Sequence, residues 1–188
     1  MKYLLLVRHS QPEIVEGIPA KEWHLSEEGR HRCESMAKIM ALYAPQAVVT
    51  SREQKALETG QVIAKKLNLP VSAAENLHEH ERSKVPFLGR DEFVVTVKRV
   101  FDHPDQLVLG DETAEQASTR FDTAVQSVLL ESSSSVAIVA HGTVMSLFAA
   151  KHTHIEAYSL WNRLGMPAML VFSLPKMELV EIIESVDS

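Results

Sequence analysis

Short runs of apolar residues alternate with longer amphipathic stretches along this chain. The runs are rich in leucine and β-branched residues and too short for helices, so they predict buried strands at 3–7, 47–50, 136–140, 169–173 and 179–183, with a weaker one at 70–73. Between them, apolar side chains recur at helical spacing after Ser26, within 56–67, around 91–101, after Thr113 and from about 143 to 151. This alternation predicts an α/β fold: a single three-layer domain over residues 1–188, with a mainly parallel central sheet flanked by helices.

Two of the predicted helices carry clear start signals. Ser26 is a favourable N-cap, and the two glutamates that follow it suit the positive end of a helix dipole. Thr113 and Gln116 have the spacing of a capping box. Pro45 is expected to end the first of these helices.

Composition narrows the functional class. The net charge is −6 without a basic block, which disfavours nucleic acid or an acidic membrane as a partner. The single cysteine, Cys33, allows no internal disulfide and no thiolate metal cluster. Only five apolar residues precede Arg8, too few for a signal-peptide core or a spanning helix, so a soluble cytoplasmic protein is expected.

Polar residues follow four of the predicted strands at the point where each ends. Arg8-His9 follows the first strand and His141-Gly142 follows the strand at 136–140, while polar clusters at 51–55 and 78–81 follow two others. Ligands of open α/β sheets lie outside the carboxyl ends of the strands, so these residues are expected to converge. Two imidazoles and a guanidinium at one edge indicate an anion site, and phosphate is the anion we expect.

At this point the chain resembles the histidine phosphatase superfamily, also called the phosphoglycerate mutase-like fold. The opening signature of that family is an Arg-His pair after an apolar strand, as at Arg8-His9. Further matches occur in the family's order at 25–29, 51–59, 77–79, 110–115 and 141–142. Each is short, but the ordered set is specific and spans most of the chain.

The resemblance implies a catalytic role for four residues. His9 would attack phosphorus and carry the phosphoryl group, with its other ring nitrogen donating to a backbone carbonyl. Arg8 and His141 would hold the non-bridging oxygens, aided by free N–H groups of a helix opening just after Gly142. Glu79 would protonate the leaving group, its pKa raised by the neighbouring phosphate, and then activate water. Neither a cofactor nor a metal is implied.

Some assignments have competitors nearby. Glu81 is an alternative general acid two residues beyond Glu79. The pairs His78-His80 and His152-His154 offer metal ligands, but neither has the spacing that places two ligands on one helix face. We therefore interpret both pairs as surface histidines.

One position departs from the family pattern. Lys55 stands where the family usually has a second phosphate-binding arginine. Lysine keeps the charge but loses the planar fork that holds two oxygens at once. Arg52, three residues earlier, is a candidate for the missing guanidinium, and a plain surface arginine is an equal alternative.

Substrate selection is expected to depend on residues 11–24 and 80–110, which would flank the pocket mouth. Gln11 would donate a hydrogen bond near the nucleophile, and Trp23 would either pack on an apolar part of the substrate or serve as a half-buried structural residue. Three cations would meet a second anionic group if these loops fold over the pocket, and would otherwise be surface charges: Arg82, Lys84 and Arg90. A separate apolar surface would pair two chains into a homodimer, and it comprises Trp161, Met166 and Leu170.

The sequence thus predicts a metal-independent phosphatase acting on a small phosphorylated metabolite. Lys55 motivates an alternative, a non-catalytic module that binds a phosphorylated ligand. A phosphoglycerate-type mutase is a third possibility, although the chain is short for enclosing a second phosphate.

Overall fold

The computed structural model describes residues 1–82, 85 and 88–187, which form one α/β domain around a six-stranded sheet. The strand order is β3-β2-β4-β1-β5-β6, and β5 runs antiparallel to both of its neighbours. The strands are β1 (Lys2–Arg8), β2 (Ala47–Thr50), β3 (Val71–Ala73), β4 (Val136–Ala140), β5 (Ala168–Leu174) and β6 (Glu178–Ile183). The predicted mainly parallel sheet is confirmed.

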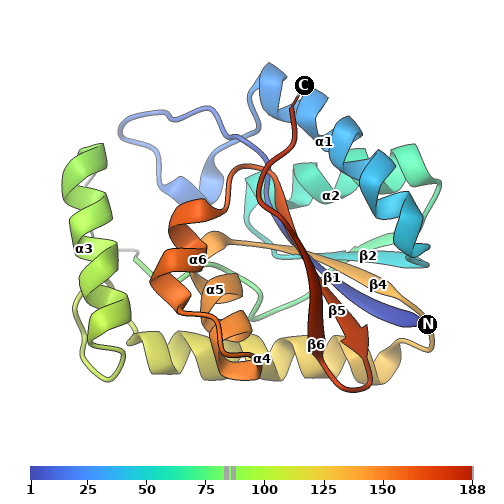
Figure 1. The fold of residues 1–188 in the computed structure, drawn as a ribbon. Helices are drawn as coiled ribbons and strands as arrows, with labels where there is room; N and C mark the ends of the chain where they lie inside the picture. Colours follow the sequence, from blue (N-terminus) through green and yellow to red (C-terminus); the bar gives the residue numbers. More distant parts are fainter. Residues whose placement is uncertain (83–84, 86–87, 188) are drawn as a thin grey trace.

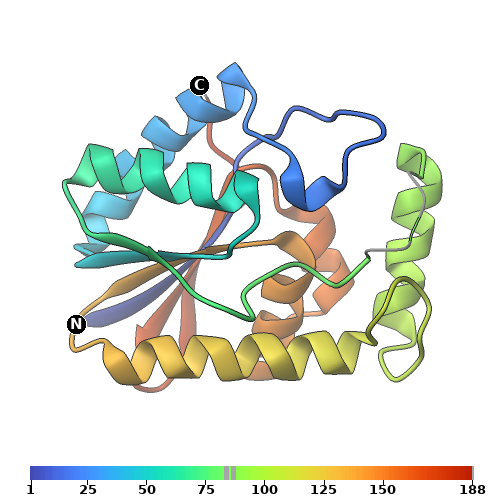
Figure 2. The same cartoon turned by 180° about the vertical axis from the view of Figure 1, so that it is seen from behind.

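Helices cover both faces of the sheet, as Figures 1 and 2 show. One face carries α1 (Glu27–Met40) and α2 (Gln54–Leu67). The other carries α4 (Ala114–Glu131), α5 (Gly142–His152) and α6 (Ala157–Arg163), while α3 (Arg90–Asp102) stands beyond the sheet. Two short 3-10 turns, η1 (Ala20–Glu22) and η2 (Ala41–Tyr43), lie in the connections. This arrangement is the predicted three-layer architecture.

Strand β1 shows why the sheet needs both helical layers. Leu4 and Leu6 belong to the core beneath α4 and α5, whereas Leu5 and Val7 belong to the core beneath α1 and α2. All four side chains are fully buried. A strand buried on both faces has no polar alternation, which explains the uninterrupted apolar run in the sequence.

The predicted helix starts are confirmed. Ser26 Oγ accepts a hydrogen bond of 3.0 Å from the backbone N–H of Gly29. Thr113 and Gln116 form a reciprocal capping box. The sequence analysis missed α6, whose first N–H groups donate to the carboxylate of Glu156, because glutamate is not a typical N-cap residue.

An aromatic cluster fastens α3 to α6. Trp161 lies 6.2 Å from Phe93 and 6.3 Å from Phe101 between ring centroids, and it stacks on Tyr158 at 6.0 Å. The expectation of an exposed apolar surface at Trp161 and Leu170 is therefore wrong, since α3 covers Trp161 and the sheet buries Leu170 completely. The homodimer inferred from that surface stays a prediction.

None of the helices within the described residues combines the length and the apolar character needed to cross a membrane.

Candidate active site

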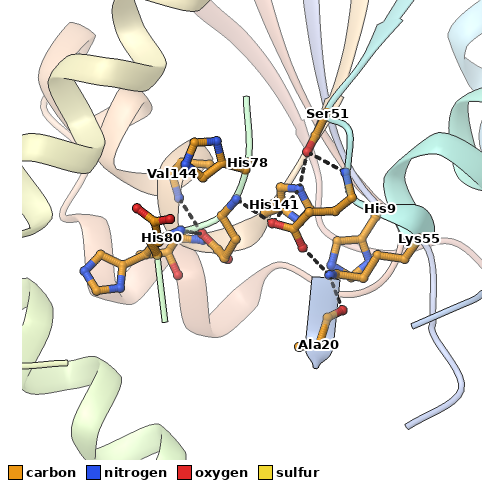
Figure 3. A network of polar contacts seen from close by, with 12 residues as sticks. His9, Ala20, Ser51, Lys55, His78, His80, His141 and Val144 are labelled. Carbon is orange, nitrogen blue, oxygen red and sulfur yellow. Dashed lines mark hydrogen bonds and ion pairs between the residues drawn. The ribbon is translucent and has the colours of Figure 1, made fainter. Parts of the chain in front are cut away.

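Sheet register brings the two strand-end histidines together. Strands β1 and β4 are parallel neighbours with Arg8 opposite Ala140, so His9 and His141 are the next residues on each. The ladder extends one step further, because the N–H of His9 donates to the carbonyl of Ala140 at 2.9 Å. The two imidazole centroids lie 5.2 Å apart. Figure 3 shows both rings beside Lys55 and Ser51.

The ring of His9 is held in one tautomer. Its Nδ1 lies 2.8 Å from the carbonyl oxygen of Ser10, and because a carbonyl only accepts, Nδ1 carries the hydrogen and Nε2 keeps its lone pair. Burial, followed by electrostatic interaction with His141 and Lys55, lowers the pKa of His9 well below its usual value. The imidazole is therefore neutral at physiological pH, as a nucleophile requires.

His141 offers a second neutral imidazole. Its Nε2 lies 2.9 Å from the hydroxyl of Ser51, at the end of β2. Burial, and then Lys55, lowers the pKa of His141 well below its usual value, although Glu79 opposes this shift. Its Nδ1 is buried without a hydrogen-bond partner among the residues that the structure describes.

The side chain of Arg8 packs between two backbone segments. One terminal nitrogen donates to the carbonyl of Leu164, and the guanidinium lies against Gly142, where an added Cβ would stand 3.0 Å from Cζ. Its Nε is also buried without a partner in the described part of the chain. A buried donor without a partner is costly, and a bound oxyanion would satisfy Arg8 Nε; it would also satisfy His141 Nδ1 in the tautomer that carries its hydrogen on Nδ1.

Glu79 occupies the amino terminus of α5. Its carboxylate accepts hydrogen bonds from the backbone N–H groups of Thr143 (3.0 Å) and Val144 (3.3 Å). The expectation that free N–H groups of this helix join the anion site is therefore wrong for Thr143 and Val144, because a protein carboxylate already binds them, whereas phosphate binding by Gly142 stays a prediction. Burial alone would raise the pKa of Glu79, but Arg82, His141 and these hydrogen bonds together lower it. The protein's own groups thus oppose the raised pKa expected from the sequence.

A buried ion pair occupies the position of the expected second arginine. Lys55 is 6% exposed, and its ammonium donates to the carbonyl of Ala20 at 2.8 Å and to the carboxylate of Glu53. Glu53 also accepts a hydrogen bond of 2.9 Å from the N–H of Glu79, and its Oε1 lies 3.5 Å from Nε2 of His141. Sequence reasoning identified Lys55 but not Glu53, whose only signal was its place in the polar cluster after β2.

The other candidate cations have different surroundings. Arg52 is not brought into the cluster: its side chain is largely exposed and pairs with Glu75 at 2.7 Å. Arg82, interpreted as a possible surface charge, is mostly buried, with its guanidinium 3.6 Å from the Glu79 carboxylate and 5.1 Å from the centre of the Phe93 ring. Arg90 is exposed at the start of α3, and Lys84 lies outside the described residues.

Trp23 and Gln11, the two loop residues expected near the substrate, form hydrogen bonds with other parts of the chain. Trp23 donates its indole N–H to carbonyls of its own loop, at 3.0 Å to Ile18 and 3.2 Å to Val15. The backbone carbonyl of Gln11 accepts hydrogen bonds from the N–H and the hydroxyl of Ser26, and the hydrogen bond expected from the Gln11 side chain stays a prediction. These contacts match the structural role considered for Trp23.

Of the two histidine pairs, only His78 lies near the cluster, where it acts on the pKa of His141. The interpretation of His80 as a surface residue is wrong, because its buried ring donates to the carbonyl of Glu112 at 2.8 Å. His152 pairs with Asp122 at 2.7 Å. The side chain of Glu81 is exposed, and its backbone N–H donates to Glu112 at 2.9 Å. Between the two acid candidates, only Glu79 contacts α5.

Comparison with solved structures finds the same fold in distant proteins. A mycobacterial glucosyl-3-phosphoglycerate phosphatase superposes with a TM-score of 0.77 at 15% identity, covering 98% of this chain and 99% of the other. YhfR from Bacillus stearothermophilus gives 0.76 at 22% identity, with 99% and 98% covered. A phosphoserine phosphatase from Entamoeba histolytica gives 0.74 at 17% identity, with 100% and 98% covered.

Sequence comparison adds the family. No curated protein sequence matches the chain. The family model described as "Histidine phosphatase superfamily (branch 1)" matches residues 4–173, from the first strand through the fifth, and this span contains all the strand-end residues described above. The chain therefore belongs to the histidine phosphatase superfamily.

Proposed function

We propose that this protein is a metal-independent phosphatase that hydrolyses a small phosphorylated metabolite through a phosphohistidine on His9. One observation carries the proposal: the Nδ1 of His9 is bound to the Ser10 carbonyl, which leaves Nε2 as a neutral nucleophile. Around it lie the half-buried Arg8 and the buried Lys55 and His141, and Arg8 and His141 each have a buried polar atom without a partner among the described residues. The proposal places the enzyme in the cytoplasm, as the sequence predicts.

The first step transfers the phosphoryl group to the enzyme. The lone pair of His9 Nε2 forms a bond to phosphorus while the bond from phosphorus to the leaving oxygen breaks. Glu79, once protonated, gives its proton to that oxygen, so the product leaves as a neutral alcohol. Arg8 and His141 hold the non-bridging oxygens as their charge redistributes. Since the protein's own groups lower the pKa of Glu79, the negative phosphate is what must bring a proton onto it.

The second step restores the enzyme. Glu79, now ionised, accepts a proton from water as the water oxygen attacks phosphorus. The bond between phosphorus and His9 Nε2 breaks, its electron pair returns to the ring, and inorganic phosphate is released. The N–H groups of α5 hold the Glu79 carboxylate in place through this exchange.

The test is phosphate release from p-nitrophenyl phosphate in the presence of EDTA, with native protein and His9→Ala. We expect release by the native protein that survives chelation and is abolished in the variant. Full activity of His9→Ala would overturn the mechanism. Because structurally similar proteins are named as phosphatases for a glucosylated phosphoglycerate and for phosphoserine, esters of these two kinds open the substrate panel.

A non-catalytic binding module is the second candidate. It is favoured by the engagement of Lys55 with Glu53 and Ala20, which leaves the site short of a free guanidinium. Phosphate binding without release from any ester would support it. A mutase would instead transfer the phosphoryl group between two positions of one sugar acid. If a phosphorylated sugar acid yields only free phosphate, the mutase alternative is excluded.

A further inference from the structure

A second carboxylate lies inside the proposed phosphate site. The side chain of Glu53 is only 12% exposed, and its two oxygens contact three parts of the site. Oε1 accepts from the N–H of Glu79 at 2.9 Å and lies 3.5 Å from His141 Nε2, while Oε2 pairs with the Lys55 ammonium. These contacts fix the carboxylate beside the residues that would bind phosphate.

Glu53 remains charged in this position. Burial alone would raise its pKa, but the charge and hydrogen bond of Lys55 and the N–H of Glu79 lower it below the ordinary value. The groups that face Glu53 come from four parts of the fold: Lys55 on α2, His9 after β1, His141 before α5, and both His78 and Glu79 after β3. Of these, Lys55 supplies the positive charge, since the pKa values of all three histidines are lowered by burial.

The ion pair also limits what Lys55 can offer a ligand. An ammonium has three N–H donors, and two are directed at the Ala20 carbonyl and the Glu53 carboxylate. One donor is left for a phosphate oxygen, where an arginine would present a fork of two.

The charges around the site then balance for a ligand of low charge. Among the described residues, three cations, Arg8, Lys55 and Arg82, are opposed by the carboxylates of Glu53 and of the ionised Glu79, and the neutral histidines add nothing. With Glu79 ionised, as it is before a ligand binds, the sum is +1, so a phosphoryl group with one negative charge neutralises the site. A dianion would leave a buried excess of negative charge next to Glu53, and such an excess is costly.

We propose that Glu53 is a specificity-determining residue that makes the site favour phosphoryl groups carrying a single negative charge. The inference rests on the proposed phosphate site but not on turnover. A phosphomonoester takes its second charge near a pH of about 6, so substrate binding should be strongest on the acidic side of neutrality.

The test is equilibrium binding of inorganic phosphate to native protein and to Glu53→Gln, measured by calorimetry. Binding is compared at about pH 5, where phosphate is a monoanion, and at about pH 8.5, where it is a dianion. Glutamine keeps an oxygen to accept the N–H of Glu79 but removes the charge. We expect affinity to rise about tenfold for the dianion and about threefold for the monoanion, because repulsion scales with the ligand's charge.

Two further variants make the result specific. Glu75→Gln removes the same charge from an exposed carboxylate and should change phosphate affinity little at either pH. Lys55→Met should have the opposite effect to Glu53→Gln: it should weaken binding of the dianion more than binding of the monoanion. Thermal unfolding of each variant confirms that it folds, and if Glu53→Gln does not, the Lys55→Met result decides the matter.

Equal affinity changes at both pH values, or weaker binding by Glu53→Gln, would overturn the inference. Turnover that persists in His9→Ala would instead refute the proposed function and leave the binding result standing. The two failures are therefore distinguishable.

Discussion

Replacing Gly142 with alanine tests how closely the Arg8 guanidinium must be placed. A Cβ at this position would stand 3.0 Å from Cζ and 3.1 Å from Nε of Arg8, whereas ordinary contacts begin at 3.4 Å. The guanidinium would have to retreat by about 0.4 Å, and its hydrogen bond to the Leu164 carbonyl limits where it can go. A misplacement of about 1 Å costs about a hundredfold in rate, so for about 0.4 Å we expect kcat/KM to fall about sixfold, equivalent to about 1.1 kcal/mol.

The same substitution should leave the fold intact. Gly142 opens α5, and alanine is favoured over glycine in helices, so the free energy of unfolding should change by less than about 1 kcal/mol. The assays are p-nitrophenyl phosphate hydrolysis and thermal unfolding. Gly89→Ala is the matched control, since that glycine precedes α3 and an added Cβ would meet no atom of the described residues within 4 Å. Native activity in Gly142→Ala would refute the assigned role of Arg8.

Three further predictions concern buried polar groups. Glu79→Gln should lower the free energy of unfolding by about 1–3 kcal/mol at neutral pH, since the charged acceptor at α5 is lost. Folding lowers the pKa of Glu79, so its contribution to the free energy of unfolding is present above the unfolded-state pKa and vanishes as pH falls through the folded-state pKa. The melting temperatures of variant and native protein should therefore converge in acid. A difference in melting temperature that stays constant with pH would contradict the assignment. Thr59→Val should lower the free energy of unfolding, measured with denaturant, by about 1–3 kcal/mol, because the Ser10 N–H beside the nucleophile loses its acceptor. Thr59→Ser keeps the hydroxyl and should lower it less. Burial raises the pKa of Cys33 to about 11, so iodoacetamide should label it only after unfolding, and rapid labelling of folded protein would contradict this.

The layers of the fold were predictable because their signals are local. Strand β1 is an unbroken apolar run, and Ser26 and Thr113 cap their helices through contacts three residues away. Helix α6 was missed because its cap is a glutamate. The burial of Trp161 was missed because the covering helix, α3, lies some 60 residues earlier in the chain.

The candidate site was likewise predictable only in part. His9 and His141 were predictable, since each follows a buried strand and parallel strands end at one edge. The contacts of Glu53 with Glu79 and His141, the helix-capping position of Glu79 and the burial of Arg82 depend on contacts between different parts of the fold, which no spacing in the sequence encodes. The pattern thus located the reactive groups, Glu79 among them, but not Glu53, the carboxylate that pairs with Lys55.

The ladder bond from His9 to Ala140 has a consequence for protein engineering. Because the nucleophile's backbone is part of the sheet, its distance from His141 is set by strand spacing rather than by the loops that follow. Loop grafts within 11–24, or exchange of the α3 segment, should therefore alter which molecules enter without displacing the two histidines. A library that varies these loops on a constant sheet would retain the reactive pair in every member.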